Sequence, residues 1–325
     1  MSITFLPLFF CAWFSQGSAW FSQDVAAHPP AGRDPAGFTI STNVELVILD
    51  ASVTDAKGGS VPALERDDFR VYEDNKLQHI KHLSHADIPV TIGLVVDNSG
   101  SMRPKRSEVV TAALALVRAG NPRDEVFVVN FNDKVRWGLP STVPFTDDTQ
   151  MLREALMKGK AQGRTALYDA LSDSLQHLNM GQRDKKTLVV MSDGGDNASK
   201  LLWSDVLTRA QKSQATIYTI DIFDDNDPDR HPDILRKLAQ VSGGQYFRVE
   251  KLPEIEGVCQ KIAADIRARY TIAYAPSHLD SGPSLHVVKV TASAPSRQRL
   301  IVRTRSQYVS PARTPASLER NGSSQ

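Results

Sequence analysis

The spacing of apolar and polar residues changes character twice along the chain. In the middle part, apolar runs occupy residues 91–96, 125–131, 186–192 and 215–220. Between and after these runs, apolar residues recur at helical spacing, which predicts helices at 105–119, 149–158, 168–180, 204–213, 233–241 and 253–268. Strands that are apolar on both faces and alternate with helices indicate a parallel sheet covered by helices on both sides. The short run 134–140 predicts an antiparallel edge strand.

Both flanks of this central part alternate apolar and polar residues, which is typical of half-buried β-strands. On the N-terminal side the alternation covers 38–55 and 69–83, with a turn signal at Asp74-Asn75. On the C-terminal side it covers 269–276, 285–293 and 298–309. Neither flank alone has enough strands to be stable, so we expect the two flanks to pair. The predicted fold class is α/β: a Rossmann-like, doubly wound, mostly parallel sheet inserted in a small antiparallel β domain formed by the N- and C-terminal segments.

The N-terminal stretch has the length of a secretory signal. An apolar core from Phe5 to Phe14 is followed by the small residues Gly17, Ser18 and Ala19, and it is short for a membrane span. Because no Lys or Arg precedes the apolar core, a wrongly chosen start or a retained membrane anchor stays an alternative. We therefore expect an exported protein (periplasmic, cell-surface or secreted) without a membrane span after cleavage. The expected division of the chain is a signal peptide (1–19), a linker (20–37), an N-terminal β segment (38–87), the α/β domain (88–268), a C-terminal β segment (269–310) and a disordered tail (311–325).

Composition and cysteine content narrow the possible functions. The formal net charge is +1, with 23% charged residues of both signs mixed along the chain, so nothing indicates a nucleic-acid or anionic membrane surface. The two cysteines are Cys11 and Cys259, and signal cleavage would leave one thiol and no intrachain disulfide. Cys259 stands at helical spacing with Ile255 and Ile262, which favours a buried structural thiol over a nucleophile.

Polar residues with oxygen side chains follow the predicted parallel strands. Asp97, Ser99 and Ser101 come directly after the first apolar run, and Asp193 follows the run 186–192. Thr165 precedes the helix predicted at 168–180. Ligands of open parallel sheets bind beyond the carboxyl ends of the strands, near the point where the strand order reverses. We therefore expect these five residues to lie at one edge of the sheet.

Oxygen ligands without His or Cys suit a hard cation. A small set with two carboxylates favours Mg²⁺, with Mn²⁺ or Ca²⁺ as alternatives. The alternate spacing of Asp97, Ser99 and Ser101 lets a tight loop, bent at Gly100, aim three side chains at one point. Two carboxylates balance the dication, so a vacant coordination position could accept a carboxylate from another molecule. Residues with an expected supporting role around the ion are Asn98, Gly163, Asp196 and Asn197.

Each ligand candidate also has a simpler interpretation. Ser101 could cap the helix that begins near Pro104, and Thr165 could cap the helix that follows it. Asp193-Gly194-Gly195 could be an ordinary turn. The acid-rich stretch 221–233 could be a calcium loop, but it lacks the Gly and terminal Glu spacing of an EF-hand and is better interpreted as a solvated loop. His177 is interpreted as a surface or packing residue.

The combination of these residues resembles a known family. Asp97-Asn98-Ser99-Gly100-Ser101, Thr165 in "GRTALYDA" and Asp193 in "MSDGGDN" are similar to the metal-ion-dependent adhesion site of von Willebrand factor type A domains, over roughly 88–268. The resemblance implies that Ser99, Ser101 and Thr165 contact the metal through hydroxyls and that Asp97 and Asp193 hold it mainly through water. The flanks resemble bacterial proteins, common among Acidobacteria, that carry a related domain between such segments, although Gln307 stands where those proteins usually have Gly before the terminal Tyr.

The resemblance implies a non-enzymatic module that binds an Asp or Glu carboxylate of a partner protein through a divalent metal. Two other hypotheses remain open from the sequence. One is a structural or assembly subunit in which the metal only stabilises the fold. The other is a metal-assisted hydrolase, for which the sequence shows no Ser-His-Asp arrangement, phosphate loop or second-metal cluster.

Overall fold

The computed structural model describes residues 46–222, 230–277, 283–294 and 299–310. The predicted signal peptide, linker and C-terminal tail lie outside these residues, as does most of the acid-rich stretch 221–233. Among the helices that are described, none is both long and apolar enough to cross a membrane.

The central part of the chain forms a six-stranded sheet with the order β10-β9-β8-β5-β6-β7. Its strands are β5 (Val90–Asp97), β6 (Glu125–Phe131), β7 (Val135–Trp137), β8 (Lys185–Ser192), β9 (Thr216–Ile222) and β10 (Tyr246–Val249). The strand pairs are parallel except for β6 with the edge strand β7, which is antiparallel. Every residue of β5 is buried, which explains why residues 92–96 form an apolar run. The expected α/β class and the antiparallel edge strand are confirmed.

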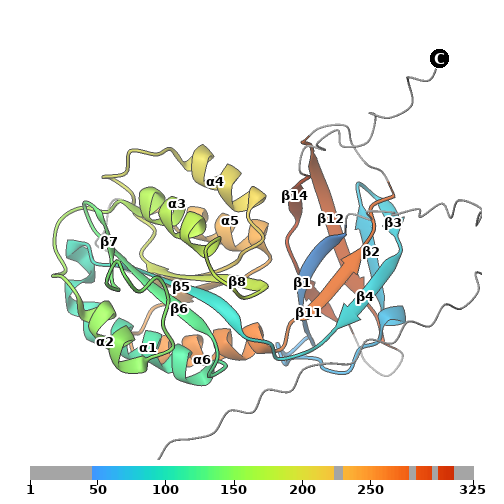
Figure 1. The fold of residues 1–325 in the computed structure, drawn as a ribbon, viewed down its shortest axis with the longest axis horizontal. Coiled ribbons are helices and arrows are strands. Elements are labelled where there is room, and N and C mark those ends of the chain that lie inside the picture. Colours follow the sequence, from blue (N-terminus) through green and yellow to red (C-terminus); the bar gives the residue numbers. More distant parts are fainter. Residues whose placement is uncertain (1–45, 223–229, 278–282, 295–298, 311–325) are drawn as a thin grey trace, which may run out of the picture. The chain divides into compact units, whose positions relative to one another are not determined.

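Helices cover both faces of this sheet (Figure 1). The helices α1 and α6 pack together with α2 beside α1, whereas α3, α4 and α5 pack in sequence on the other side. Their bounds are α1 (Arg106–Ala119), α2 (Thr149–Met157), α3 (Leu167–Leu178), α4 (Trp203–Lys212), α5 (Pro232–Ser242) and α6 (Glu254–Arg267). Because the connections from β5 and β8 leave toward opposite faces, the strand order reverses between these two strands.

The flanking segments form two further four-stranded sheets, with the orders β13-β1-β11-β4 and β14-β12-β2-β3. Strands from the N-terminal side are β1 (Val47–Thr54), β2 (Phe69–Glu73), β3 (Lys76–Gln78) and β4 (Ile80–Ser84). Those from the C-terminal side are β11 (Tyr270–Tyr274), β12 (Leu285–Ala292), β13 (Ile301–Arg303) and β14 (Gln307–Val309). Each sheet contains strands from both flanks, in antiparallel pairs such as β1 with β11 and β2 with β12. The predicted pairing of the two flanks is thus confirmed.

One apolar core is shared by these two sheets. Leu49 and Tyr270 come from the first sheet, and Phe69 and Val290 from the second; all four side chains are buried in the same cluster. The small domain is therefore a sandwich whose interior depends on residues from both ends of the chain. Its burial supplies the hydrophobic stabilisation that neither flank could provide alone.

The prediction of a single strand over 298–309 is wrong. The segment forms β13, which pairs with β1, and β14, which pairs with β12 in the other sheet. Between them, the Arg305 side chain donates hydrogen bonds to the carbonyls of Gln211 and Ser213 at the end of α4. The segment changes sheets here, held by contacts with residues almost a hundred positions away. Gln307 accepts a hydrogen bond from the Gln211 side chain at 3.0 Å.

Two further elements differ from the sequence interpretation. The helix expected from residue 105 is preceded by a 3-10 helix, η2 (Gly100–Lys105), which contains Pro104. The strand β10 was not expected, because it is only four residues long and follows a Gly-Gly pair. It pairs with the outer side of β9 and becomes the edge of the sheet.

Candidate functional site

The carboxyl end of β5 carries the first part of the predicted site. Asp97 is the last residue of β5 and is buried, with 1% of its surface exposed. Its Oδ1 accepts a hydrogen bond from the Ser99 backbone N–H at 2.8 Å. Its Oδ2 accepts one from the Ser192 hydroxyl at 2.7 Å. The carboxylate therefore holds the loop after β5 against the end of β8.

A continuous line of oxygen atoms joins this loop to the loop after β8. The Oγ atoms of Ser99 and Ser101 are 3.0 Å apart. The Ser101 hydroxyl donates to Oδ2 of Asp193 at 2.7 Å. Ser99 and Asp193 are buried, whereas Ser101 is half-buried. Three of the five predicted residues thus converge through their side-chain oxygens.

The loop before α3 is attached to the other two loops through its backbone. Gly100 donates its N–H to the Gly163 carbonyl at 3.1 Å. The Thr165 N–H donates to Oδ1 of Asn197 at 2.9 Å, and the Asn197 N–H donates back to the Thr165 carbonyl at 2.9 Å. Thr165 itself is buried. Hydrogen bonds therefore place Thr165 between the loops that carry the serines and Asp193.

The residues expected to support the site have separate roles. Gly163 and Asn197 position the Thr165 loop, as just described. The carboxylate of Asp196 accepts from the Tyr168 N–H at 3.1 Å and from the Ser199 hydroxyl at 2.6 Å, so it stabilises the first turn of α3. Asn98 is buried, and its Oδ1 has no hydrogen-bond partner in the described part of the chain.

The capping interpretations of Ser101 and Thr165 are wrong. The N-cap residues of α1 and α3 are Lys105 and Ala166, and neither makes a side-chain capping bond. Ser101 lies inside η2 and donates to Asp193 instead. The turn after Asp193 is present, because Gly194 has φ +84° and the Gly195 N–H donates to Asp193 Oδ1 at 3.3 Å. This turn aims the second oxygen of Asp193 at Ser101.

Two buried carboxylates in one site oppose each other electrostatically. Burial, and next the charge of Asp193, raise the pKa of Asp97 to about 7. Hydrogen bonds from Ser99 and Ser192 act in the opposite direction without cancelling these effects. The charge distribution of the site would therefore become more favourable if a cation lay beside both carboxylates.

Two residues that support the site were missed from sequence. Ser192 donates to Asp97 and also accepts from the Gly194 N–H, at 3.1 Å. Asp133 accepts from the backbone N–H of Arg164 at 3.2 Å, next to Gly163. The position of Ser192, directly before Asp193 at the end of an apolar run, was a usable signal. Asp133 gave none, because its partner is 31 positions away.

Gly163 is a position where only glycine fits, and replacing it by Ala should lower the free energy of unfolding by about 1–3 kcal/mol. Its φ is +83°, and a Cβ would lie 1.9 Å from Oδ2 of Asp133. Gly159→Ala is the matched control, because Gly159 has φ +85° and a Cβ added to it would meet nothing within 4 Å. Urea unfolding of both variants separates the cost of backbone strain from the cost of displacing Asp133. Both variants strain the backbone, whereas Gly163→Ala alone displaces Asp133. Equal losses would contradict the proposed contact with Asp133.

The two other residues considered from the sequence, Cys259 and His177, are packed against other side chains. Cys259 lies on α6 and is fully buried in the core of the α/β domain, and burial raises its pKa to about 12, as expected for a structural thiol. His177 packs against the rings of Phe127, Trp137 and Phe145, and its Nε2 lies 3.0 Å from the Pro144 carbonyl. Its interpretation as a packing residue agrees with these contacts.

Comparison with known proteins identifies the central domain. Residues 92–195 match the family model described as von Willebrand factor type A domain, so this part of the chain contains such a domain. An uncharacterised protein of Synechocystis sp. is 25% identical over 173 residues, which are 51% of this chain and 39% of that protein. The chain thus spans about two fifths of the length of this relative.

Solved structures with similarity to the chain include other proteins with this type of domain. A von Willebrand factor type A protein from Catenulispora acidiphila aligns with a TM-score of 0.49 and 13% identity, over 74% of this chain and 72% of that one. The vWF domain of the type V pili tip protein from Porphyromonas gingivalis aligns with a TM-score of 0.43 and 14% identity, over 56% and 97%. A proximal thread matrix protein from the mussel byssus, solved with a zinc-occupied adhesion-site motif, aligns with a TM-score of 0.46 and 15% identity, over 56% and 49%.

Proposed function

We propose that the chain is a non-enzymatic protein-binding module whose central domain captures an Asp or Glu carboxylate of a partner protein through a divalent cation. The proposed ligands of the cation, directly or through water, are Asp97, Ser99, Ser101, Thr165 and Asp193. Mg²⁺ is the expected ion, with Mn²⁺ or Ca²⁺ as alternatives. Domains of this family typically mediate protein interactions and commonly bind a divalent metal, which supports both parts of the proposal.

The observation that carries the proposal is the spacing of the converging oxygens. Ser99 Oγ and Ser101 Oγ are 3.0 Å apart, and Ser101 Oγ and Asp193 Oδ2 are 2.7 Å apart. Around an octahedral ion with Mg–O distances of about 2.0–2.1 Å, neighbouring ligand oxygens are separated by roughly 2.9 Å. The side chains are therefore already spaced as adjacent ligands of such an ion would be. The donor set contains oxygen alone, which suits a hard cation.

The charges of the site favour a cation that still attracts a further anion. Asp97 and Asp193 are buried, and two ionised carboxylates would balance one dication. Serine and threonine hydroxyls add no charge, so the ion is only just neutralised and remains a strong acceptor for a third carboxylate. The half-buried Ser101 lies at the accessible side of this group. A carboxylate from outside would replace a water on the ion, because Mg²⁺ usually keeps several waters in proteins.

A pull-down from an envelope extract tests the proposed function. We expect the immobilised full chain to capture a partner in Mg²⁺ and to lose it in EDTA. The Asp97→Ala variant should capture nothing above background in Mg²⁺, whereas Asp147→Asn, which changes an exposed acid distant in sequence from the site, should behave like the wild type. Partners recovered equally in Mg²⁺ and EDTA would contradict a metal-bridged interaction.

The same preparations separate this function from the two other hypotheses. If Mg²⁺ raises the melting temperature of the wild type but captures no partner, the metal only stabilises the fold. Metal-dependent hydrolysis of a substrate by the wild type, lost in Asp97→Ala, would favour the hydrolase. Export of the protein is also part of the proposal, and it rests on the apolar stretch near Phe5–Phe14 and on the likeness of the flanks to bacterial proteins. Fractionation of the cells tests it.

A further inference from the structure

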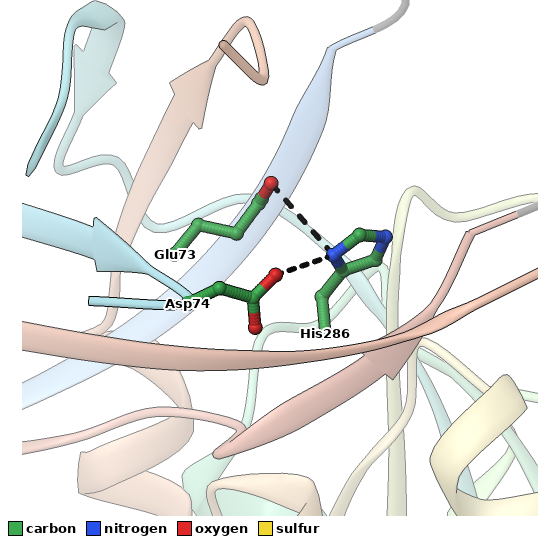
Figure 2. Close-up of side chains that lie close together, drawn as sticks. All are labelled: Glu73, Asp74 and His286. Atoms are coloured by element: carbon green, nitrogen blue, oxygen red, sulfur yellow. Dashed lines mark hydrogen bonds and ion pairs between the residues drawn. The ribbon is translucent and has the colours of Figure 1, made fainter. Parts of the chain in front are cut away.

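The β-sandwich contains a second group of metal-ligating side chains, made of Glu73, Asp74 and His286 (Figure 2). Nδ1 of His286 lies 2.8 Å from Oδ2 of Asp74 and 3.9 Å from Oε1 of Glu73. One ligand atom from each residue falls within 4.8 Å of the others. None of the three belongs to the α/β domain or to the site proposed above.

The backbone fixes this group in place. Glu73 is the last residue of β2, and Val288 of β12 is its partner in the antiparallel register. Asp74 follows in a hairpin turn in which Asp74 and Asn75 have φ of +48° and +65°. The turn brings two consecutive acids to the side of His286, which stands on β12 and stacks on the ring of Tyr308.

The remaining polar atoms of all three side chains are held by residues outside the group. Oδ1 of Asp74 accepts from the Val287 N–H at 2.9 Å. Oε2 of Glu73 accepts from the hydroxyls of Tyr274 at 2.5 Å and Tyr308 at 2.8 Å. Nε2 of His286 lies 2.9 Å from the Ser284 hydroxyl. Such outer contacts orient metal ligands, and here they leave Nδ1 of His286 directed at the two carboxylates.

Glu73 supplies an independent observation. Its side chain is 3% exposed, and the hydroxyls of Tyr274 and Tyr308 donate to Oε2, whereas Oε1 lies 3.9 Å from Nδ1 of His286. A buried carboxylate is costly unless a cation compensates its charge.

We propose that Oε1 of Glu73, Oδ2 of Asp74 and Nδ1 of His286 bind a transition-metal dication, with Zn²⁺ as the leading ion. An imidazole with two carboxylates suits Zn²⁺ and its neighbours in the series, whereas the all-oxygen site on the α/β domain suits Mg²⁺. Water would complete the coordination. The ion would link the β2–β3 hairpin from the N-terminal flank to β12 from the C-terminal flank, and so stabilise the sandwich when bound.

Cobalt(II) is the probe that tests this site, because its visible absorption bands report nitrogen ligation and low coordination number. The full chain is titrated with Co²⁺ in excess Mg²⁺, which occupies an all-oxygen site. We expect one equivalent of Co²⁺ to give visible bands that one equivalent of Zn²⁺ removes. No bands in the folded wild type under these conditions would overturn the proposal, whatever the result for the oxygen site.

Variants assign the bands to the group. Asp74→Asn removes a charge from a half-exposed residue and keeps an Oδ1 that can accept from Val287, so the fold should persist while Co²⁺ affinity falls about 10–100-fold. His286→Gln should abolish the bands, and His79→Gln, at an exposed histidine, should leave them unchanged. If His286→Gln does not fold, the Co²⁺ titration of Asp74→Asn alone tests whether the group binds the metal. Bands of wild-type intensity and affinity in Asp74→Asn would show that the group is a metal-free ion-pair network.

Discussion

Asp193→Asn should weaken Mg²⁺ and Mn²⁺ binding on the order of 100-fold or more. Residues that merely orient a metal ligand already contribute about 10–100-fold to affinity, and Asp193 is proposed to hold the ion with one of only two carboxylates. The substitution keeps the shape of the side chain, so Gly195 can still donate to an oxygen and Ser101 retains a partner. Calorimetric titration gives the affinity directly.

Stability measurements show whether the loss is specific. In metal-free buffer we expect Asp193→Asn to be at least as stable as the wild type, because it removes one of two opposed, buried carboxylates. At a Mg²⁺ concentration of about 100 Kd, the wild type should gain roughly 2.7 kcal/mol, and the variant should gain almost nothing.

The matched control is Asp196→Asn, which makes the same charge change three positions away. Its carboxylate is engaged by Tyr168 and Ser199 at the start of α3, so metal affinity should change far less than in Asp193→Asn. Equal losses in the two variants would mean that the loop charge, rather than ligation by Asp193, controls the affinity. That outcome would contradict the proposed ligand set.

The α/β core could be predicted from sequence because its strands are buried on both faces. Burial on both faces of β5 favours the apolar run at residues 92–96, and this run is visible without any tertiary information. The convergence of Ser99, Ser101 and Asp193 was predictable for a related reason, because the carboxyl ends of parallel strands meet at one sheet edge. Their assignment as metal ligands remains a prediction.

Features that depend on distant contacts could not be predicted in this way. The change of sheets between β13 and β14 is fixed where Arg305 binds the end of α4, and nothing in the local sequence marks it. Glu73 and His286 are brought together by the β2–β12 register. No motif spacing connects residues over two hundred positions apart, so this group could be found in the folded structure alone.

Asp265→Ala should lower the free energy of unfolding by about 3–5 kcal/mol. Asp265 lies on α6, and its carboxylate accepts from the hydroxyls of Tyr218 in β9 and Ser52 in β1. The guanidinium groups of Arg269 and Arg303 lie 3.5 Å and 3.0 Å from its oxygens. Because Arg269 is 2% exposed, removing the carboxylate leaves a buried positive charge without this partner. The variant thereby also removes contacts that join the α/β domain to the sandwich.

The pH dependence of this loss distinguishes the charge from packing. Burial would raise the pKa of Asp265, but the charges of Arg269 and Arg303 and the hydrogen bonds from Ser52 and Tyr218 outweigh it, and the pKa is lowered below 3.8. A carboxyl with a lowered folded pKa contributes stability that is complete above the unfolded pKa and is lost as the pH falls through the folded value. The difference in unfolding free energy between wild type and Asp265→Ala should therefore be largest at neutral pH and should shrink below pH 3.8.

Glu256→Ala, at an exposed acid on the same helix, is the matched control. Its free energy of unfolding should stay within about 0.5 kcal/mol of the wild type both at neutral pH and below pH 3.8. A difference for Asp265→Ala that is independent of pH would mean that lost packing, rather than the uncompensated charge of Arg269, causes the destabilisation.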